Sequence, residues 1–392
     1  MSTINRTIIE IHALETTAAG NLNRDDTGSP KTVEYGGTTR ARVSSQAWKR
    51  PTRELFKELV DPNDLGIRTK RVVEELTGRI LECRGDLSEE QATMLAETVL
   101  QGGAGIKLEK PRKKKADEID DDGRVKQSQY LLFLGNRQYD QLADLAIEAT
   151  DTDDPIKKIK GDKKRIKQIV SNDRSIDVTL FGRMVADDTD LNVDACAQVA
   201  HAISVQTVEP ESDFFTAVDD NQRNGGEDEA GDVGAAMMGQ VEFNAATFYR
   251  YANVDANRLQ DRLGDVNATA KAVSAFVQAF LTSVPQGKIN TFGQNVLPDL
   301  IVVNLRDTQA VNMVGAFERP VAPDYVQHAT EALVRRQQDL DRAYDIAPVK
   351  TWVVRIGDDT VAADALVDGK TTSLRDMVVD IERTIANRLT QE

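Results

Sequence analysis

The chain has 392 residues, a hydrophobic content of 40% and a formal net charge of −15 at pH 7. That length allows about two or three domains. The hydrophobic content is sufficient for a sizeable core, which excludes a mainly disordered chain. The acidity excludes a uniformly basic nucleic-acid-binding protein and a polybasic membrane anchor.

Cysteine and histidine are too scarce for a disulfide framework or a structural zinc site. The chain has two cysteines, Cys83 and Cys196, and three histidines, without the spacing that zinc ligands need. The longest apolar runs are far shorter than the roughly 20 residues of a membrane span. No apolar signal core follows Met1. We therefore expect a cytoplasmic protein that binds no membrane, metal or cofactor.

Charge is distributed unevenly along the chain. Residues 31–53 and 107–115 each carry a net charge of +5, and residues 157–167 carry +6. Residues 209–232 have the opposite bias, with nine acidic side chains against Arg223 alone. An acidic protein with dense basic islands can still bind a polyanion locally.

The N-terminal region is predicted to form a strand, a long loop and a helix. Residues 7–14 are rich in β-branched side chains, which favours a strand. Residues 15–39 are rich in Thr, Gly, Asn and Asp and indicate a long loop. Long ordered loops are often functional. A helix is expected from Ser44 or Ser45 to about Val60. Pro51 either kinks this helix or marks the start of its regular part.

Residues 67–180 are predicted to be mostly helical, with no alternating strand pattern. Ser88 and Gln91 have the spacing of a capping box, and Gly102-Gly103 would end the helix that follows. Further helices are expected over 127–149 and 157–170. The charged run at 107–123 indicates a loop between helices. We interpret the whole stretch as a helical insertion.

After residue 180 the pattern changes to β structure. Residues 199–218 and 240–251 are predicted strands of a hairpin, with the acidic, Gly-rich residues 219–236 at its tip. There follow a helix (267–284), a buried strand (301–305), a second helix (324–344) and an edge strand (351–356). The succession strand, helix, strand, strand, helix, strand indicates an α+β fold with a ferredoxin-like or RRM-like core.

Three blocks of sequence carry a family resemblance. The first comprises Asn21-Leu22-Asn23-Arg24-Asp25-Asp26, Tyr35-Gly36-Gly37 and Arg42-Val43-Ser44-Ser45-Gln46-Ala47-Trp48-Lys49-Arg50. The second is Asp177-Val178-Thr179-Leu180-Phe181-Gly182-Arg183-Met184. The third comprises Ala200-His201-Ala202-Ile203, Asp213-Phe214-Phe215-Thr216-Ala217-Val218-Asp219-Asp220, Val241-Glu242-Phe243 and Phe248-Tyr249-Arg250-Tyr251-Ala252. In order and spacing they resemble the CasC-type backbone subunits of type I-E Cascade, the CRISPR RNA-guided surveillance complex, within the RAMP superfamily.

This resemblance implies a right-hand-shaped protein. An RRM-like palm would comprise residues 1–60, 181–207 and 243–392. Helical fingers would comprise residues 61–180, and a β-hairpin thumb residues 208–242. Several copies would form a helical filament along the CRISPR guide RNA and present its bases to target DNA during antiviral defence. The other Cascade subunits (large, small, Cas-five-type and guide-processing) would be further partners, and this subunit would not be an enzyme.

The resemblance also indicates which residues bind RNA. A guide of any sequence must be held through phosphate and sugar rather than base edges, and the cationic side chains and helix N-terminus of the first block suit phosphate. Met184 suits apolar packing on a base or ribose. The predicted RNA-binding residues are Asn23, Arg24, Lys31, Ser44, Ser45, Gln46, Lys49, Arg50, Arg53, Arg183 and Met184.

The thumb residues Phe214, Phe215 and Thr216 are predicted to wedge between nucleotides and contact a neighbouring copy. Because side chains alternate along a strand, one phenylalanine is expected to pack and the other to stack on a base. The family more often has Trp at the position of Phe214, and residues 225–232 form a longer acidic tip than is usual.

Several alternatives stay open at this point. Asp25 and Asp26 lie where type III relatives place a catalytic Asp, so a metal-dependent target-RNA endonuclease is the second hypothesis. The simpler interpretation of both is loop hydrogen bonding. A protein-only filament is the third hypothesis. For residues 107–115 and 157–167, a solvated surface is the simpler interpretation and contact with a DNA strand the alternative. His201 is expected to pack or to form hydrogen bonds.

Overall fold

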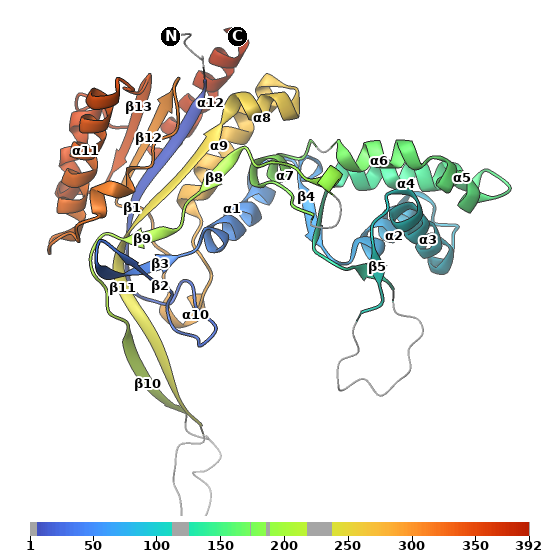
Figure 1. Ribbon diagram of the computed structural model, residues 1–392, viewed down its shortest axis with the longest axis horizontal. Helices are drawn as coiled ribbons and strands as arrows, with labels where there is room; N and C mark the ends of the chain where they lie inside the picture. The colour runs from blue at the N-terminus through green and yellow to red at the C-terminus, as the bar shows by residue number, and fades with distance from the viewer. Residues whose placement is uncertain (1–5, 112–124, 173, 186–188, 218–236, 392) are drawn as a thin grey trace, which may run out of the picture. The chain divides into compact units, whose positions relative to one another are not determined.

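The computed structural model describes residues 6–111, 125–172, 174–185, 189–217 and 237–391 (Figure 1). The chain divides into two compact units. The first, which we call the sheet unit, comprises Met1–Leu55, Val199–Asp255 and Phe276–Glu392. The second, the helical unit, comprises Phe56–Gln198 and Ala256–Ala275. Both units are therefore built from segments that are far apart in sequence.

The sheet unit contains an antiparallel sheet with the strand order β13-β12-β1-β11-β9-β3-β2. Strand β1 (Ile8–Gly20) lies between β12 and β11, and its first eight residues are all buried. The other strands on this path are β2 (Thr32–Tyr35), β3 (Thr38–Val43), β9 (Ala202–Ser204), β11 (Met237–Asp255), β12 (Leu300–Arg306) and β13 (Lys350–Arg355). The predicted buried strand at 301–305 and edge strand at 351–356 are confirmed.

The N-terminal strand is longer than the sequence predicted, and the prediction of one loop over residues 15–39 is wrong. Strand β1 continues through Glu15, Thr16 and Thr17 because these residues pair with β11. Strands β2 and β3 then form a hairpin, with positive φ angles at Gly36 and Gly37 in its turn. Pairing with a neighbouring strand outweighs weak local propensity here.

Helices complete the sheet unit. Two of them continue into the helical unit: α1 (Ser45–Leu59), which runs through Pro51, and α9 (Val266–Thr282). The others are α10 (Ile289–Phe292), α11 (Tyr325–Tyr344) and α12 (Leu374–Gln391), with 3-10 helices at Met313–Phe317 and Asp358–Leu366. Side chains of β1, β11, β12, β13 and α11 share one hydrophobic core. The predicted helices at 267–284 and 324–344 are confirmed.

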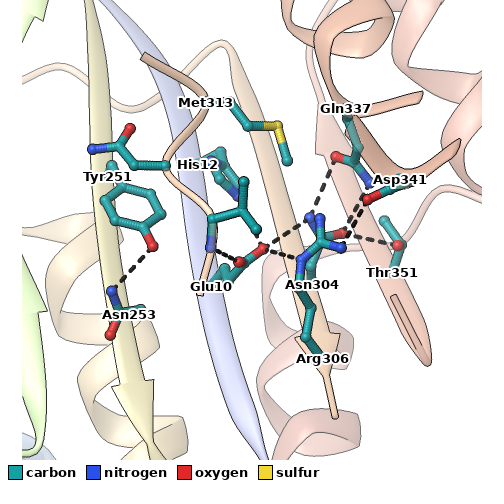
Figure 2. Close-up of polar contacts among 12 residues, drawn as sticks. Glu10, His12, Tyr251, Asn253, Asn304, Arg306, Met313, Gln337, Asp341 and Thr351 are labelled. Atoms are coloured by element: carbon teal, nitrogen blue, oxygen red, sulfur yellow. Dashed lines mark hydrogen bonds and ion pairs between the residues drawn. The ribbon is translucent and has the colours of Figure 1, made fainter. Parts of the chain in front are cut away.

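A buried polar network joins β1 to the C-terminal elements (Figure 2). The guanidinium of Arg306 donates to the Glu10 carboxylate over 2.8 Å and to the Asp341 carboxylate over 2.7 Å. On β1, His12 Nδ1 lies 2.9 Å from the Tyr249 hydroxyl. Glu10, His12 and Arg306 are fully buried. These contacts fix β12 and α11 against the first strand.

The helical unit comprises mainly short helices. These are α2 (Val72–Cys83), α3 (Glu89–Glu97), α4 (Asn136–Thr150), α5 (Pro155–Gly161), α6 (Lys163–Ser171), α7 (Ile176–Phe181) and α8 (Ala256–Leu263). A π-helix (Thr98–Gly103) follows α3, and 3-10 helices lie at Pro62–Asp64 and Thr189–Leu191. The predicted capping box is present, because Ser88 Oγ accepts from Gln91 N and Gln91 Oε1 accepts from Ser88 N.

The prediction of a strand-free insertion is wrong. Strand β4 (Gly66–Thr69) pairs with β7 (Leu132–Gly135), and β5 (Leu108–Glu109) pairs with β6 (Gln127–Ser128). The expected helix over 127–149 therefore begins only at Asn136. The residues of β7 are buried, and so short an apolar run does not distinguish a strand from a helix. The expected helix over 157–170 is two helices, which meet at Asp162.

The predicted hairpin after residue 199 is confirmed. Strand β10 (Glu211–Ala217) pairs with the first part of β11, and a short strand, β8 (Ala197–Val199), precedes it in the chain. The predicted acidic tip at 219–236 lies outside the described residues. In the described part of the chain, no helix combines the length and apolarity needed to cross a membrane.

Candidate nucleic-acid interface

An ordered loop, residues 21–31, precedes the β2–β3 hairpin. The side-chain amide of Asn21 donates to the carbonyl oxygens of Gly28 and Glu242 over 3.0 and 2.9 Å. Asp25 Oδ1 accepts from the backbone N and hydroxyl of Thr27 and from Ser29 N, at 2.7 to 3.0 Å. The Thr27 hydroxyl bond is the main reason that the pKa of Asp25 is lowered. The loop thus holds the exposed Arg24 in a defined backbone.

This loop is tied to the start of α1. Asn23 Oδ1 accepts from Ser44 N over 2.9 Å, and the Ser44 carbonyl accepts from Ala47 N over 3.0 Å. Ser44 is only 8% exposed, whereas Ser45 is half-buried and Gln46 is exposed. Of these predicted RNA contacts, Asn23 and Ser44 join the loop to the helix. Ser45 and Gln46 leave the first turn of α1 accessible to an anion.

The predicted basic face of α1 is accessible to different degrees. The Arg50 side chain is 82% exposed and forms an ion pair with Glu54 over 3.1 Å. Lys49 and Arg53 are half-buried, and burial lowers the pKa of Lys49. A long cationic side chain buries its stem and leaves its charged end accessible. Lys49 is thereby positioned more firmly than Arg50.

The opposite face of α1 is fixed by a buried arginine. Trp48 is 1% exposed, and the guanidinium of Arg250 lies 3.7 Å from the centroid of a Trp48 ring and 4.6 Å from that of Phe280. Arg250 also donates to the Glu15 carboxylate and to the Phe280 carbonyl. Both partners of this ion pair are 1% exposed. Strands β1 and β11 therefore hold α1, and with it Lys49.

Sequence reasoning did not include Arg42 among the binding residues. Its Nε donates to the Thr32 carbonyl over 3.1 Å, and its guanidinium lies 3.0 Å from His201 Nδ1. Burial, and then the charges of Arg42 and Lys31, lower the pKa of His201. A neutral His201 accepts from Arg42, which confirms the expectation of a hydrogen-bonded histidine. Because 159 residues separate the two, only the pairing of β3 with β9 reveals this cationic surface.

Another arginine of the basic island at 31–53 is fully buried. Arg40 donates to the carbonyl oxygens of Ser204, Val205, Phe317 and Glu318 at 2.9 to 3.2 Å. Burial lowers the pKa of Arg40. Its role is to hold the β2–β3 hairpin on the 3-10 helix at Met313–Phe317, so the charge available to a ligand is smaller than the sequence implies.

Two predicted RNA-binding residues lie in the helical unit. Arg183 is 5% exposed and donates to the carbonyl oxygens of Leu191, Phe133 and Val170 at 2.6, 2.9 and 3.0 Å. We therefore correct its role from RNA contact to structural residue, because its guanidinium is occupied and shielded from solvent. Met184 is 85% exposed. Its apolar side chain is therefore accessible for packing on a ligand.

The two phenylalanines of β10 differ in their surroundings. Phe215 lies opposite Gly239 in the hairpin, and a Cβ built on Gly239 would stand 2.5 Å from Phe215 Cζ. The Phe215 ring therefore rests on the glycine. Phe214 is 64% exposed, against 38% for Phe215, and Thr216 is also exposed. The geometry favours Phe214 as the ring that is free to stack.

The second hypothesis, a metal-dependent nuclease, requires carboxylates that can bind a metal ion. Asp25 and Asp26 are both exposed, and Asp25 Oδ1 is already occupied by the loop. Among the described residues, no group of three or more His, Cys, Asp or Glu side chains is placed to hold a metal ion. The geometry of Asp25 thus fits the simpler interpretation, loop hydrogen bonding.

Similarity to known proteins extends over nearly the whole chain. Residues 9–380 match the model of the CT1975-like protein family. A chain of a "CRISPR RNA-guided surveillance complex, pre-nicking" is 33% identical with a TM-score of 0.80, over 96% of this chain and 100% of that one. A chain of a "CRISPR RNA-guided surveillance complex" is 28% identical with a TM-score of 0.70, over 95% and 100%. No curated protein matches.

The protein therefore belongs to the CT1975-like protein family. The similarity to the two solved chains covers both units and supports the α+β fold, with its large antiparallel sheet and its helices.

Proposed function

We propose that this protein is a CRISPR RNA-binding backbone subunit of a Cascade effector complex of type I-E. The observation that supports this most strongly is the TM-score of 0.80, at 33% identity, to a chain of a CRISPR RNA-guided surveillance complex that is covered along its whole length. Copies of the protein would assemble along the guide RNA. Base pairing would then read the target DNA, as in other RNA-guided systems.

The proposed palm is supported by the connectivity of the sheet unit. In chain order it contains β1, α1, β9, β11, α9 and β12, which is the strand–helix–strand–strand–helix–strand succession of a ferredoxin-like fold. The strands of this succession are adjacent in the sheet as β12, β1, β11 and β9. The helical unit would supply the fingers, and the β10–β11 hairpin the thumb.

The proposed RNA-binding surface combines fixed backbone with accessible charge. Arg24, Lys31 and Arg42 extend from the loop and the β2–β3 hairpin, and Lys49 and Arg53 extend from α1. These side chains suit phosphate oxygens, which carry no sequence information. Exposed Phe214 would add stacking, which tolerates any base. The protein would therefore hold guides of every sequence alike.

The partners we propose are the guide RNA, target DNA paired to it, further copies of this chain, and the other Cascade subunits. The role is structural rather than catalytic. A cytoplasmic location accords with a guide RNA and a DNA target. No described contact favours the nuclease alternative, because the Asp25 carboxylate stabilises its own loop.

The proposal is tested by co-expressing the chain with a CRISPR array and its neighbouring genes, purifying through a tag on this chain, and sequencing the bound RNA. We expect intact repeat–spacer RNA of defined length that is stable in Mg²⁺. RNA cut at regular intervals in Mg²⁺ would instead support the nuclease, and absence of RNA would contradict both.

A second test separates RNA binding from a protein-only filament. If about five phosphates are neutralised per copy, the logarithm of affinity should fall with the logarithm of salt concentration, with a slope of about −0.7 per contact on a single strand. Lys49→Ala with Arg53→Ala should weaken binding to all guides equally, whereas the control Lys370→Ala with Arg375→Ala should not. A flat salt response would contradict RNA binding.

A further inference from the structure

His201 lies in the cationic surface of the sheet unit, close to the start of α1. It comes just before strand β9, and the antiparallel register places Val43 of β3 opposite Ala202. His201 and Ser44 are therefore the next residues of the two segments at this end of the pairing. Because His201 is exposed, both solvent and a ligand can reach it.

The contact with Arg42 defines the protonation state of His201 in the free protein. The Arg42 guanidinium lies 3.0 Å from His201 Nδ1, and a guanidinium has only hydrogen-bond donors. Nδ1 must therefore carry a lone pair, and the proton of the neutral ring resides on Nε2. Partial burial, and then the charges of Arg42 and Lys31, lower the pKa of His201, which agrees with a neutral ring.

The groups that face His201 are held together by backbone hydrogen bonds. Lys31 N donates to the Asn23 carbonyl over 2.9 Å, and Arg42 N donates to the Lys31 carbonyl over 2.8 Å. The Arg42 side chain is also held, because its Nε donates to the Thr32 carbonyl over 3.1 Å. Among the described residues, the charged groups that act on the His201 ring are Arg42 on β3 and Lys31 beside β2, and both are cations. A proton added to His201 would thus need an anion from outside the protein.

We propose that His201 is a further RNA-binding residue, which takes up a proton as the guide RNA binds and then donates a hydrogen bond to a phosphate oxygen. The inference rests on the proposed function, which brings RNA phosphates to this surface. A phosphate attracts the Arg42 guanidinium, because bonds between two charged groups are stronger than a bond to a neutral ring. Nδ1 is thereby released from Arg42.

The released nitrogen can then bind a proton from solvent. A new N–H bond forms on Nδ1, and the ring gains one positive charge. The negative charge of the phosphate stabilises this protonated ring, whereas Arg42 alone opposes it. Arg42 and His201 would then share the phosphate, so the surface gains a cation only when RNA is bound.

The direction of the pH dependence follows from this proton uptake. The bound state holds a proton that the free protein lacks at neutral pH, so affinity should rise as the pH falls. The rise ends once the free protein is protonated as well. Each pH unit between the His201 titration midpoints of the free and bound states is worth about tenfold in affinity. We expect affinity to rise about three- to tenfold from pH 8 to pH 5.5.

The test measures binding of the full chain to an oligouridine guide RNA at constant ionic strength between pH 8 and pH 5.5. Uracil does not titrate in this range, so the RNA contributes no proton of its own. His201→Gln keeps an acceptor for Arg42 but cannot become charged. The chain has only three histidines, and His12 is fully buried. His328→Gln on α11 is therefore the matched control.

Fluorescence anisotropy would give the affinities, and calorimetry in two buffers of different ionisation enthalpy would give the protons taken up. Wild type and His328→Gln should show the full rise and a net proton uptake near pH 6.5. His201→Gln should lose the uptake, and its affinity should change less than about twofold between the two pH limits. Where His201→Gln fails to fold, Arg42→Gln serves, because loss of the opposing cation should make the rise smaller and move it to higher pH.

Three results would overturn the proposal. The affinity of the wild type may show no rise at low pH, or His201→Gln may retain the same rise as the wild type. If instead His201→Gln weakens binding equally at every pH, His201 only positions Arg42. Failure of the wild-type chain to bind RNA at any pH would contradict the proposed function, so the two failures are distinguishable.

Discussion

Replacement of Arg250 by Met tests how the basic face of α1 is positioned. Arg250 packs over the rings of Trp48 and Phe280 and donates to Glu15, whose side chain is 1% exposed. Methionine fills a similar volume but leaves the Glu15 carboxylate buried without a cation. Removal of one partner of a buried ion pair costs about 3–5 kcal/mol. We expect Arg250→Met to lower the free energy of unfolding of the sheet unit by that amount at pH 8.

The loss should depend on pH in a defined direction. Burial raises the pKa of Glu15 above its unfolded value, and Arg250 opposes this rise. Without Arg250 the folded-state pKa rises further, so the folded protein binds a proton that the unfolded chain releases. Stability then falls as pH rises from the unfolded pKa to the folded pKa. Arg250→Met should therefore be less destabilising at pH 5 than at pH 8.

The assay is urea unfolding followed by tryptophan fluorescence. The two tryptophans, Trp48 and Trp352, both lie in the sheet unit, so the signal reports that unit. The double variant Glu15→Gln with Arg250→Met removes the charge and should regain most of the stability at both pH values. The reasoning is refuted if Arg250→Met costs less than about 1 kcal/mol at pH 8, or if the double variant is no more stable than Arg250→Met.

Three further predictions concern other parts of the sheet unit. Phe214→Ala should weaken RNA binding by about 1–3 kcal/mol, whereas Phe215→Ala should cost less, as measured with guides carrying a fluorescent base; equal losses would contradict the assignment of Phe214 as the stacking ring. Gly36→Ala should unfold the β2–β3 hairpin locally, because Gly36 has a φ of 62° and its Cβ would overlap the Glu318 carbonyl oxygen. Faster amide hydrogen exchange confined to the hairpin would confirm this. Burial raises the pKa of Asp380, but hydrogen bonds from a lysine, a tryptophan and an arginine outweigh it and lower the pKa to about 2. Its stabilising effect is thus present above the unfolded pKa and lost as pH falls towards 2, and Asp380→Asn should abolish this acid dependence in thermal unfolding.

The elements that sequence predicted well are those with a strong local signal. The helix over 267–284 has apolar residues at helical spacing, and the strand at 301–305 is mostly apolar and lies between β13 and β1. The capping box at Ser88 requires only two side chains at fixed spacing. Each of these signals is complete within a few residues of chain, so no tertiary contact was needed to find it.

The elements that were missed depend on partners far away in sequence. Strands β4 and β7 are four residues each, and they form because they pair across more than 60 residues. The extension of β1 to Gly20 depends in the same way on β11.

The same limit applies to the candidate site. The family resemblance selected Arg183, and the net charge of residues 31–53 included Arg40, yet both side chains donate to carbonyl groups inside the protein. Sequence reasoning also did not assign Arg42 a role, because His201, which accepts from it, is 159 residues away, just before strand β9. The sequence gives the number of cationic side chains in a basic island. Only the folded structure distinguishes the side chains that a ligand can reach from those that are buried.

The contacts of Arg40 and Glu10 have a consequence for the order in which the protein is made. Arg40 requires the carbonyl groups of Phe317 and Glu318, and Glu10 requires Arg306. On the ribosome, these partners are synthesised more than 270 residues after the N-terminal segments that need them. The β2–β3 hairpin that carries Arg42 is therefore completed only when most of the chain has been translated. A nascent chain does not present the finished cationic surface, so under the proposed function it would not bind RNA before most of the chain has been made.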